Sequence, residues 1–509
     1  MKIRNYYYVL CLSTAVFVSC TDLKEEVLDG VQLEQAASEY AVNDLNAATL
    51  LTSAYEAMRG PYQDQARLNC LDEHSTDAMV GPTRGGDWDD AGVWRQLHAH
   101  TFGANHGFNK DTYNDMYNAV NAANLVLGSS GATTQQKAEA RFLRALHYYH
   151  IIDLWGQAAY REIGSDTNAD APVYQRAEAT DWVISELEAA ITDLPESTNA
   201  TKASKNSARW LLAKLYLNYG VFTGDPANPT FDNANMDKVI SNVDAITGVS
   251  LAADYWDNFL PQNTETSSEL IFVSQNFGGQ ASGNVRSRWH MGQHYAQTPS
   301  GWNGFTTLAE YYDKFDPNDE RIYKEFANIN AENGYNVGFQ IGQQYGLGGP
   351  NVGAPLNDRL DNPLVFTKEI QLITGGATLE SAGVRGVKYV PDNDSGDNAD
   401  NDFVIARLAD ALLMKAEALS RKGDNGGAQT VVQQLANEAT TTISSTNDIL
   451  ETRARELWWE GWRRNDMIRF GTFLNERELK PYVSDPKFLL YPIPLAGTTN
   501  PNITQNPGY

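Results

Sequence analysis

Residues 138–156 read AEARFLRALHYYHIIDLWG, and the spacing of their apolar side chains indicates the fold class of the chain. Apolar residues recur here at intervals of four and three, which places them on one face of an α-helix. These positions are Ala138, Phe142, Ala145, Tyr149 and Ile152. The stretch therefore predicts an amphipathic helix that runs up to a turn at Gly156.

The same spacing recurs on both sides of this stretch. Further apolar stripes begin at residues 47, 113, 183 and 208, and two more begin at 405 and 431 after a long gap. Short turns rich in Gly, Ser, Asn and Pro separate the stripes into pairs, as in degenerate tetratricopeptide-like helix hairpins. The sequence therefore predicts a mainly α protein with a tetratricopeptide-like helical repeat scaffold. An irregular helical array is the alternative, because the consensus signature of the repeat is absent.

Two long segments between the helical stripes have a different composition. Residues 60–106 and 276–402 are rich in Gly, Asn, Asp and aromatic residues and show little helical period. Loops of this length inside a compact domain are usually functional, so we expect them to form a ligand face on the scaffold. No Pro/Ser-rich linker or charge block divides the chain, which predicts one domain over residues 20–509.

The first 20 residues have the pattern of an export signal. Lys2 and Arg4 precede an apolar stretch that ends in FVSC at residues 17–20. This stretch is shorter than the roughly 20 residues that a spanning helix needs, and a small residue directly before cysteine is typical of a bacterial lipobox. We therefore expect residues 1–19 to be removed and Cys20 to carry acyl chains that anchor the body to a membrane. An ordinary signal peptide with a coincidental cysteine is the alternative.

The remaining cysteines and the net charge narrow the class of protein. Once Cys11 has left with the signal and Cys20 is lipidated, Cys70 has no cysteine with which to form an intramolecular disulfide. The formal net charge is −25, and it becomes −27 when the signal, with two cations and no acid, is removed. Such a charge disfavours binding to nucleic acid and suits a neutral ligand.

Several motifs occur in a fixed order along the chain. They are residues 140–156, residues 407–418 (RLADALLMKAEA), residues 453–470 (RARELWWEGWRRNDMIRF, expected as one helix), and the closing YPIP at 491–494 with NPNITQNPGY at 500–509. Together they resemble the RagB/SusD family of outer-membrane nutrient-binding lipoproteins, and the resemblance covers essentially the whole chain. Trp459, Trp462 and Ala159 depart from the residues usual in that family, at positions that concern packing.

The resemblance implies a scaffold of four tetratricopeptide-like repeats and a binding function without catalysis or a cofactor. It implies a lipid-anchored protein, exposed on the cell surface at the outer membrane. Such a protein would capture oligosaccharide or polysaccharide and deliver it to a SusC-like TonB-dependent transporter. A surface glycoside hydrolase, and a family member with peptide or glycoprotein cargo, are the alternatives.

Residues 82–94 (PTRGGDWDDAGVW) supply the side chains that sugars need. A sugar ring has an apolar face that stacks on aromatic rings and a rim of hydroxyls that bond to carboxylates and guanidinium groups. The Gly-Gly pair predicts a tight turn that holds Trp88 out on a tip, with Arg84 and Asp87 beside it. Such a stretch also resembles what many glycan-binding members carry. A core tryptophan is the alternative for Trp88, and Trp94 is predicted to be buried.

A second aromatic cluster lies within residues 286–304. It contains Trp289, Tyr295 and Trp302 among three glycines and a proline, a composition that disfavours a stable helix. We therefore expect these aromatic side chains to stand on loops and to stack on glycan. The alternative is that they pin the long loops to the helices.

Two acidic features resemble functional sites but do not support one. Glu456 and Glu460 lie one turn apart, yet arginines three or four residues away would keep both ionised, which predicts a structural ion-pair lattice. Residues 392–400 (DNDSGDNAD) depart from a calcium loop at Gly396 and at Phe403, which favours a solvated loop over calcium. No zinc-protease, serine-hydrolase or phosphate-loop motif is present, so the sequence predicts neither a metal nor an enzyme.

Overall fold

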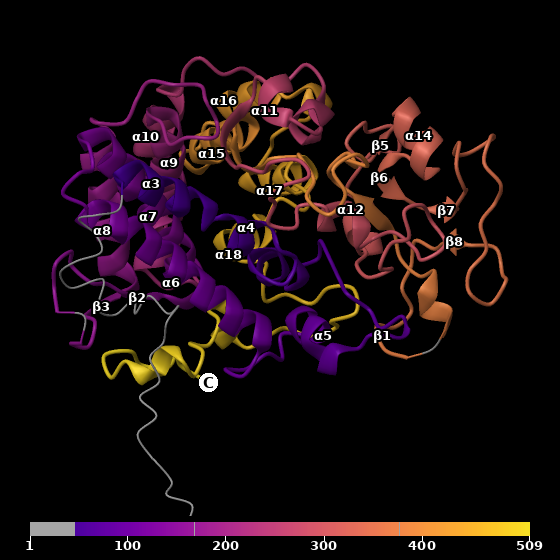
Figure 1. The fold of residues 1–509 in the computed structure, drawn as a ribbon, viewed down its shortest axis with the longest axis horizontal. Coiled ribbons are helices and arrows are strands. Elements are labelled where there is room, and N and C mark those ends of the chain that lie inside the picture. Colours follow the sequence, from indigo (N-terminus) through magenta and orange to yellow (C-terminus); the bar gives the residue numbers. More distant parts are fainter. Residues whose placement is uncertain (1–45, 167, 376) are drawn as a thin grey trace, which may run out of the picture.

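The computed structural model describes residues 46–166, 168–375 and 377–509, so the predicted lipid anchor at Cys20 lies outside the described residues. Long helices gather on one side of the molecule, and a lobe of short strands and loops forms the other side (Figure 1). The helices of the scaffold are α3 (Ala47–Glu56), α6 (Gly107–Gly128), α7 (Thr134–Trp155), α8 (Arg176–Ala190), α9 (Lys205–Thr223), α10 (Asn233–Asp244), α15 (Leu408–Arg421), α16 (Asn425–Val432) and α17 (Thr446–Glu456).

Helix α7 is the most buried of the long helices, and both of its ends follow from the sequence. Thr133 and Gln136 form a reciprocal capping box at its start, and Gly156 ends it with a left-handed φ of 71°. The helix packs between α6 and α8, α8 packs on α9, and α9 packs on α10. Consecutive helices thus pair as in tetratricopeptide repeats, which confirms the predicted fold class.

Three local predictions were wrong or incomplete. The sequence analysis did not predict α10, in which only Met236, Val239 and Val243 are buried. Ile405, expected in a helix, lies in strand β10 (Phe403–Arg407). The single helix expected over residues 453–470 is broken, because α17 ends at Glu456 and α18 spans Arg463–Arg469. Between them the backbone turns at Trp459 (φ 58°) and Gly461 (φ 83°).

The segment of residues 276–402 leaves the scaffold and returns to it through two neighbouring strands. Strand β4 (Leu270–Ser274) pairs antiparallel with β10, and all residues of both strands are buried. Between them lies the strand-rich lobe on the right of Figure 1. Its elements are α12 (Ser287–His290), α13 (Ala309–Tyr312), α14 (Ala327–Asn333), the sheet of β5 (Tyr323–Lys324), β6 (Val337–Gln340) and β9 (Arg385–Val387), and the pair β7 (Gly342–Gln343) and β8 (Val365–Phe366).

The other predicted loop segment, residues 60–106, is mostly part of the core. It contains α4 (Arg59–Gln63), a π-helical turn (Cys70–His74), β1 (Gly85–Trp88) and α5 (Val93–His98), and residues 68–84 are all buried. Its exposed positions are Gly60, Thr101, Asn105 and most of residues 85–91. The prediction of a loop-built face therefore holds for a short part of this segment alone.

A buried ion-pair network joins the lobe to the scaffold. Arg407, at the end of β10, is 1% exposed, and its guanidinium contacts carboxylates from two other segments. It lies 2.9 Å from Glu269 Oε1, 2.7 Å from Glu456 Oε1 and 2.9 Å from Glu460 Oε1. From the lobe, Lys388 adds a bond of 3.0 Å to Glu460, so the network crosses the boundary between the two parts.

This network confirms that Glu456 and Glu460 form a structural lattice, although with partners other than those predicted. Arg321 also binds Glu456, at 3.0 Å. Burial would raise the pKa of Glu456, but the charges of Arg407 and Arg321 outweigh it and lower that pKa. The nearby arginines of the motif serve other carboxylates instead: Arg453 binds Asp466, and Arg463 binds Asp77. Arg453 lies on α17 with Glu456, whereas Arg463 begins α18 after the break at residues 457–462.

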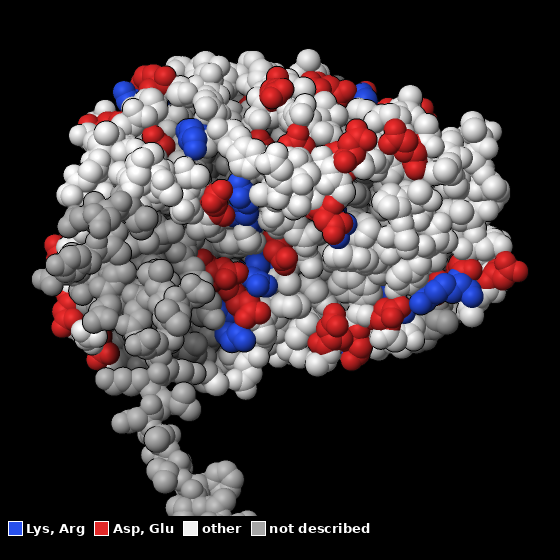
Figure 2. Space-filling model, viewed as in Figure 1, with Lys and Arg blue, Asp and Glu red and all other residues white. Residues whose placement is uncertain are grey.

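The surface of the molecule is acidic. On the face drawn in Figure 2, acidic side chains are more widespread than basic ones. Within the described part of the chain, every helix is too short or too polar to cross a membrane.

Replacing Arg407 with Met is expected to lower the free energy of unfolding by about 3 to 5 kcal/mol, because it removes the cation that pairs with the buried Glu269 and weakens the pairing of Glu456 and Glu460. Thermal or denaturant unfolding measures the loss. Lys205→Met is the control, because it removes a 3.3 Å pair with the exposed Glu196 and should cost at most about 1 kcal/mol. A similar small effect in both variants would contradict a central role for the network.

Candidate functional site

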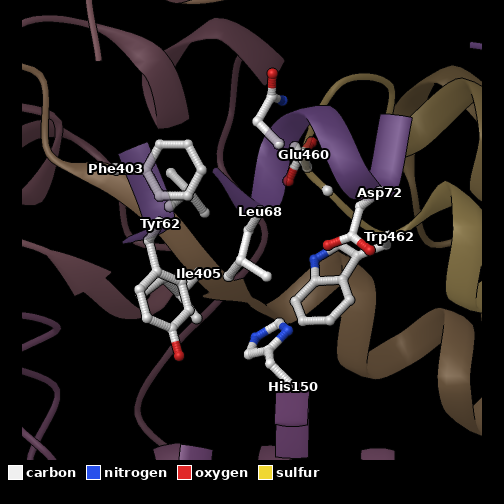
Figure 3. Close-up of a pocket in the computed structure, with 11 residues that line it drawn as sticks. Tyr62, Leu68, Asp72, His150, Phe403, Ile405, Glu460 and Trp462 are labelled. Carbon is white, nitrogen blue, oxygen red and sulfur yellow. The ribbon is translucent and has the colours of Figure 1, made fainter. Parts of the chain in front are cut away.

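One enclosed cavity lies inside the molecule, between α7, β10 and the turn at residues 460–462 (Figure 3). Asp72, His150 and Trp462 face it, but the space open to a water-sized sphere is only about 20 Å³. A single water molecule needs about 10 to 15 Å³, so this cavity has room for one or two waters and none for a sugar. Burial raises the pKa of Asp72 well above its usual range. The cavity belongs to the core.

Two of the predicted glycan-binding residues, Arg84 and Trp289, are buried instead of exposed. Arg84 is 0% exposed, and its guanidinium donates to the carbonyls of Gly304, Leu379 and Ala382. It therefore ties the lobe together and has no face for a ligand. Trp289 is 3% exposed and lies in the single helical turn α12, where a loop was expected. Only its edge reaches a surface cavity.

Trp88 is half-buried and is not held out on a tip. Its ring packs against Phe305 and the buried Trp94, with centroids 5.2 and 5.7 Å away. Its indole N–H donates to the carbonyl of Trp302 at 2.7 Å. A Cβ at Gly304 would lie 2.5 Å from the Trp88 ring, so the glycine permits this contact. Trp88 thus supports the loop that carries Trp302 and keeps part of its ring at the surface.

On one side of that loop, Tyr295, Asp87 and Arg359 form an exposed cluster. The Tyr295 hydroxyl donates to Asp87 at 2.6 Å, and Arg359 donates to the same carboxylate at 3.1 Å. The Arg359 guanidinium also lies 4.3 Å from the centroid of the Tyr295 ring. Two predicted residues are therefore brought together by a third, Arg359, which the sequence analysis missed. Its segment shows no periodicity or motif that would have identified it.

On the other side of the loop, Trp302 lies beside an open cavity. Arg286 lies 5.6 Å from the centroid of the half-buried Trp302 ring, and the His290 ring meets it edge-on at 4.9 Å. Both Arg286 and His290 line a cavity of about 370 Å³. The other lining residues are Trp289, Thr298, Pro299, Glu332, Asn333, Asp392, Asn393, Gly396 and Asp397. An aromatic platform, a cavity and hydrogen-bonding groups thus lie along one loop.

Three carboxylates of this face are bonded to cations. Arg359 binds Glu380 at 2.9 Å as well as Asp87, and Arg286 binds Asp397. Burial would raise the pKa of Glu380, but its bonds from Arg359 and His294 lower it. By contrast, burial raises the pKa of Glu73 to about 8, but this residue is enclosed in the core. A glycosidase needs a protonated acid beside its ligand, whereas these paired carboxylates suit hydrogen bonding to hydroxyls.

The acidic loop at residues 392–400 is stabilised by its own backbone. Asp392 accepts hydrogen bonds from the amides of Asp394, Ser395 and Asp400. Within residues 46–166, 168–375 and 377–509, no group of three or more His, Cys, Asp or Glu side chains could hold a metal ion. The loop is partly exposed, as expected of a solvated loop.

Comparison with known families matches nearly all of the chain. A model described as the SusD family matches residues 248–509, just over half of the sequence. The chain belongs to the SusD family. A second model, described as "Starch-binding associating with outer membrane", matches residues 32–217. The family predicted from the sequence motifs is thereby confirmed.

One relative of this SusD-family chain is named for starch binding, and another is named SusD-like. Starch-binding protein SusD of Bacteroides thetaiotaomicron is 29% identical over 423 residues, which cover 74% of this chain and 73% of that protein. A SusD-like protein of Bacteroides ovatus is 24% identical over 390 residues, which cover 72% and 64% of the two chains. The family and these relatives agree with the prediction of a protein that is not an enzyme.

Solved structures show the same fold. A laminarin-binding SusD-like protein superposes with a TM-score of 0.67 at 19% identity, covering 92% of this chain and all of that one. Surface glycan-binding protein A from Bacteroides thetaiotaomicron, in complex with laminarihexaose, superposes with a TM-score of 0.64 at 17% identity, covering 90% and 98% of the two chains. The helical scaffold and its lobe are thus those of the SusD fold.

Proposed function

We propose that this protein is a cell-surface glycan-binding protein and that the loop of residues 295–302 is the centre of its binding face. The observation that carries the proposal is the presence at the surface of Asp87, Tyr295, Arg359 and Trp302, which combine half-buried aromatic rings with exposed charged groups. Sugars need this combination, because their C–H faces stack on aromatic rings while their hydroxyls bond to carboxylates and guanidinium groups. Relatives that are named for binding starch and laminarin support it.

The proposed site is built for binding and release. Arg359 holds Asp87 and Glu380, and Arg286 holds Asp397, so a hydroxyl-rich ligand meets groups that are already ordered. We propose that Asp87, Tyr295 and Trp302 contact the glycan. Trp88 supports the backbone at Trp302. The hydrolase alternative is disfavoured, because Arg359 forms ion pairs with both Asp87 and Glu380. Peptide or glycoprotein cargo remains the alternative outcome of a binding screen.

The same proposal includes the place of the protein in the cell. The FVSC sequence at residues 17–20 supports a lipid anchor, and the second matching model is described as associating with the outer membrane. A single tether at Cys20 would not by itself aim a glycan at a pore. We therefore propose that the folded body docks on a SusC-like TonB-dependent transporter and passes its glycan to it.

Trp302→Ala should weaken retention in polysaccharide gels about tenfold, or about 1.4 kcal/mol, and leave the melting temperature nearly unchanged. Trp289→Ala should instead lower stability by roughly 3 to 5 kcal/mol, because that ring is buried. The matched control is Trp182→Ala, since Trp182 is a half-buried tryptophan of α8 that packs on Tyr148 and Tyr160. Equal retention by the Trp302 and Trp182 variants would contradict the proposed face.

Cys20→Ala should abolish lipidation, because the acylated thiol is the predicted anchor. The variant is expected to leave the membrane fraction after cell lysis, whereas the wild-type protein pellets with it. A high-salt wash separates lipid anchoring from adsorption by charge. Pelleting of the washed variant would show that the lipobox assignment is wrong.

Docking on a transporter predicts co-purification. When a SusC-like transporter from the same genome is expressed in the same cells, it should co-purify with the tagged protein in mild detergent. Cys20→Ala secreted into the same compartment is the control that separates protein contact from shared membrane. Recovery of the tagged wild-type protein alone would count against the docking proposal.

A further inference from the structure

The cavity beside Trp302 is lined by Thr298 and Pro299 of the loop and by three further segments of the chain. Arg286, Trp289 and His290 come from α12 and the residue before it, Glu332 and Asn333 end α14, and residues 392–397 close it. Its volume of about 370 Å³ lies within the range of small-molecule sites, about 300 to 1,000 Å³. The walls are fixed to each other, because the Asn393 amide donates to Glu332 at 2.7 Å and to Asn333 at 2.8 Å.

His290 is the feature of this cavity that points to a ligand. The residue is only 8% exposed, and neither ring nitrogen forms a hydrogen bond within the part of the chain that the structure describes. Its ring packs edge-on against Trp302 and lines the cavity. Burial, followed by the charge of Arg286, lowers the pKa of His290 to about 4, so the ring is neutral at physiological pH. A neutral imidazole offers one donor and one acceptor, which suits a sugar hydroxyl.

The charges that line the cavity are unbalanced toward acid. Glu332, Asp392 and Asp397 line it, and Arg286 is the one lysine or arginine among its lining residues. The guanidinium of Arg286 is already paired with Asp397. Both carboxylate oxygens of Asp392 accept hydrogen bonds from backbone amides, and Glu332 accepts one hydrogen bond from Asn393. An anionic group that entered this space would meet uncompensated negative charge in a partly desolvated site.

We propose that this cavity is a subsite for an uncharged sugar ring of the bound glycan and that its carboxylates exclude uronate and sulfate groups. The inference rests on the proposed glycan-binding function and specifies the class of glycan. A ring that stacks on Trp302 would place the next ring of the chain against His290, Glu332 and Asn393. The protein therefore selects neutral glycans over polyanionic ones through this cavity as well as through its net charge.

The test compares retention of the full-length protein in gels that contain starch or laminarin, which are neutral, with alginate or polygalacturonate, which are anionic. Wild-type protein should be retained by a neutral glycan and not by the anionic ones, even at low ionic strength where charge effects are largest. His290→Ala should weaken neutral binding roughly threefold to tenfold, as the loss of one hydrogen bond predicts. His290→Gln, which restores a donor and an acceptor, should recover part of it.

Charge reversal at the exposed Glu332 separates the cavity from net charge. Glu332→Lys should gain retention on alginate, whereas Glu162→Lys, at an exposed residue that does not line the cavity, changes the net charge equally and should not. Melting temperatures identify any variant that fails to fold. Three outcomes would each overturn the inference and leave the proposed function intact. They are an equal gain in alginate retention by both lysine variants, retention of the wild-type protein on alginate, and unchanged retention of the folded His290 variants on the neutral glycan. Absence of retention on every gel would overturn both.

Discussion

The positive charge of Arg407 has to be neutralised inside the protein, and the rest of the architecture depends on how this is done. Its carboxylate partners come from the residue before β4 and from the C-terminal segment, while Arg407 itself ends β10. A buried charge without its partner costs several kcal/mol, so these segments have to be in place together. Lys388 extends the requirement into the lobe. We therefore expect scaffold and lobe to unfold together.

Such anchoring explains how long, irregular segments can hold the side chains of the proposed ligand face in fixed positions. A loop of this length loses much conformational entropy when it is ordered, and the cost is offset by buried contacts. Arg84 binds three carbonyls of the lobe, and Trp88 supports the backbone at Trp302 and Gly304. Buried or half-buried side chains thus hold in place the loops that carry the solvent-exposed side chains. This arrangement keeps the proposed platform organised before a ligand arrives.

Sequence reasoning succeeded where structure is local and failed where it depends on distant partners. The periodicity and capping residues of α7 predict that helix directly, because both signals lie within it. Arg359 was missed because it meets Asp87 across 272 positions. Trp289 and Trp302 have similar neighbours in sequence, yet one is buried in α12 and the other is half-exposed. Burial of that kind is decided by the whole fold, which composition alone does not specify.

The pairing of β4 with β10 has an evolutionary consequence. Because Leu270 lies opposite Arg407 and Ser274 opposite Phe403, the two ends of the long insertion are neighbours in space. A segment whose ends already meet can lengthen, shorten or be exchanged without displacing the helices on which it stands. Natural variation in such a lineage could thus replace the recognition surface while the supporting body, and whatever docks on it, stays the same. The paired strands thus form a constant attachment point for insertions that can differ in sequence and length.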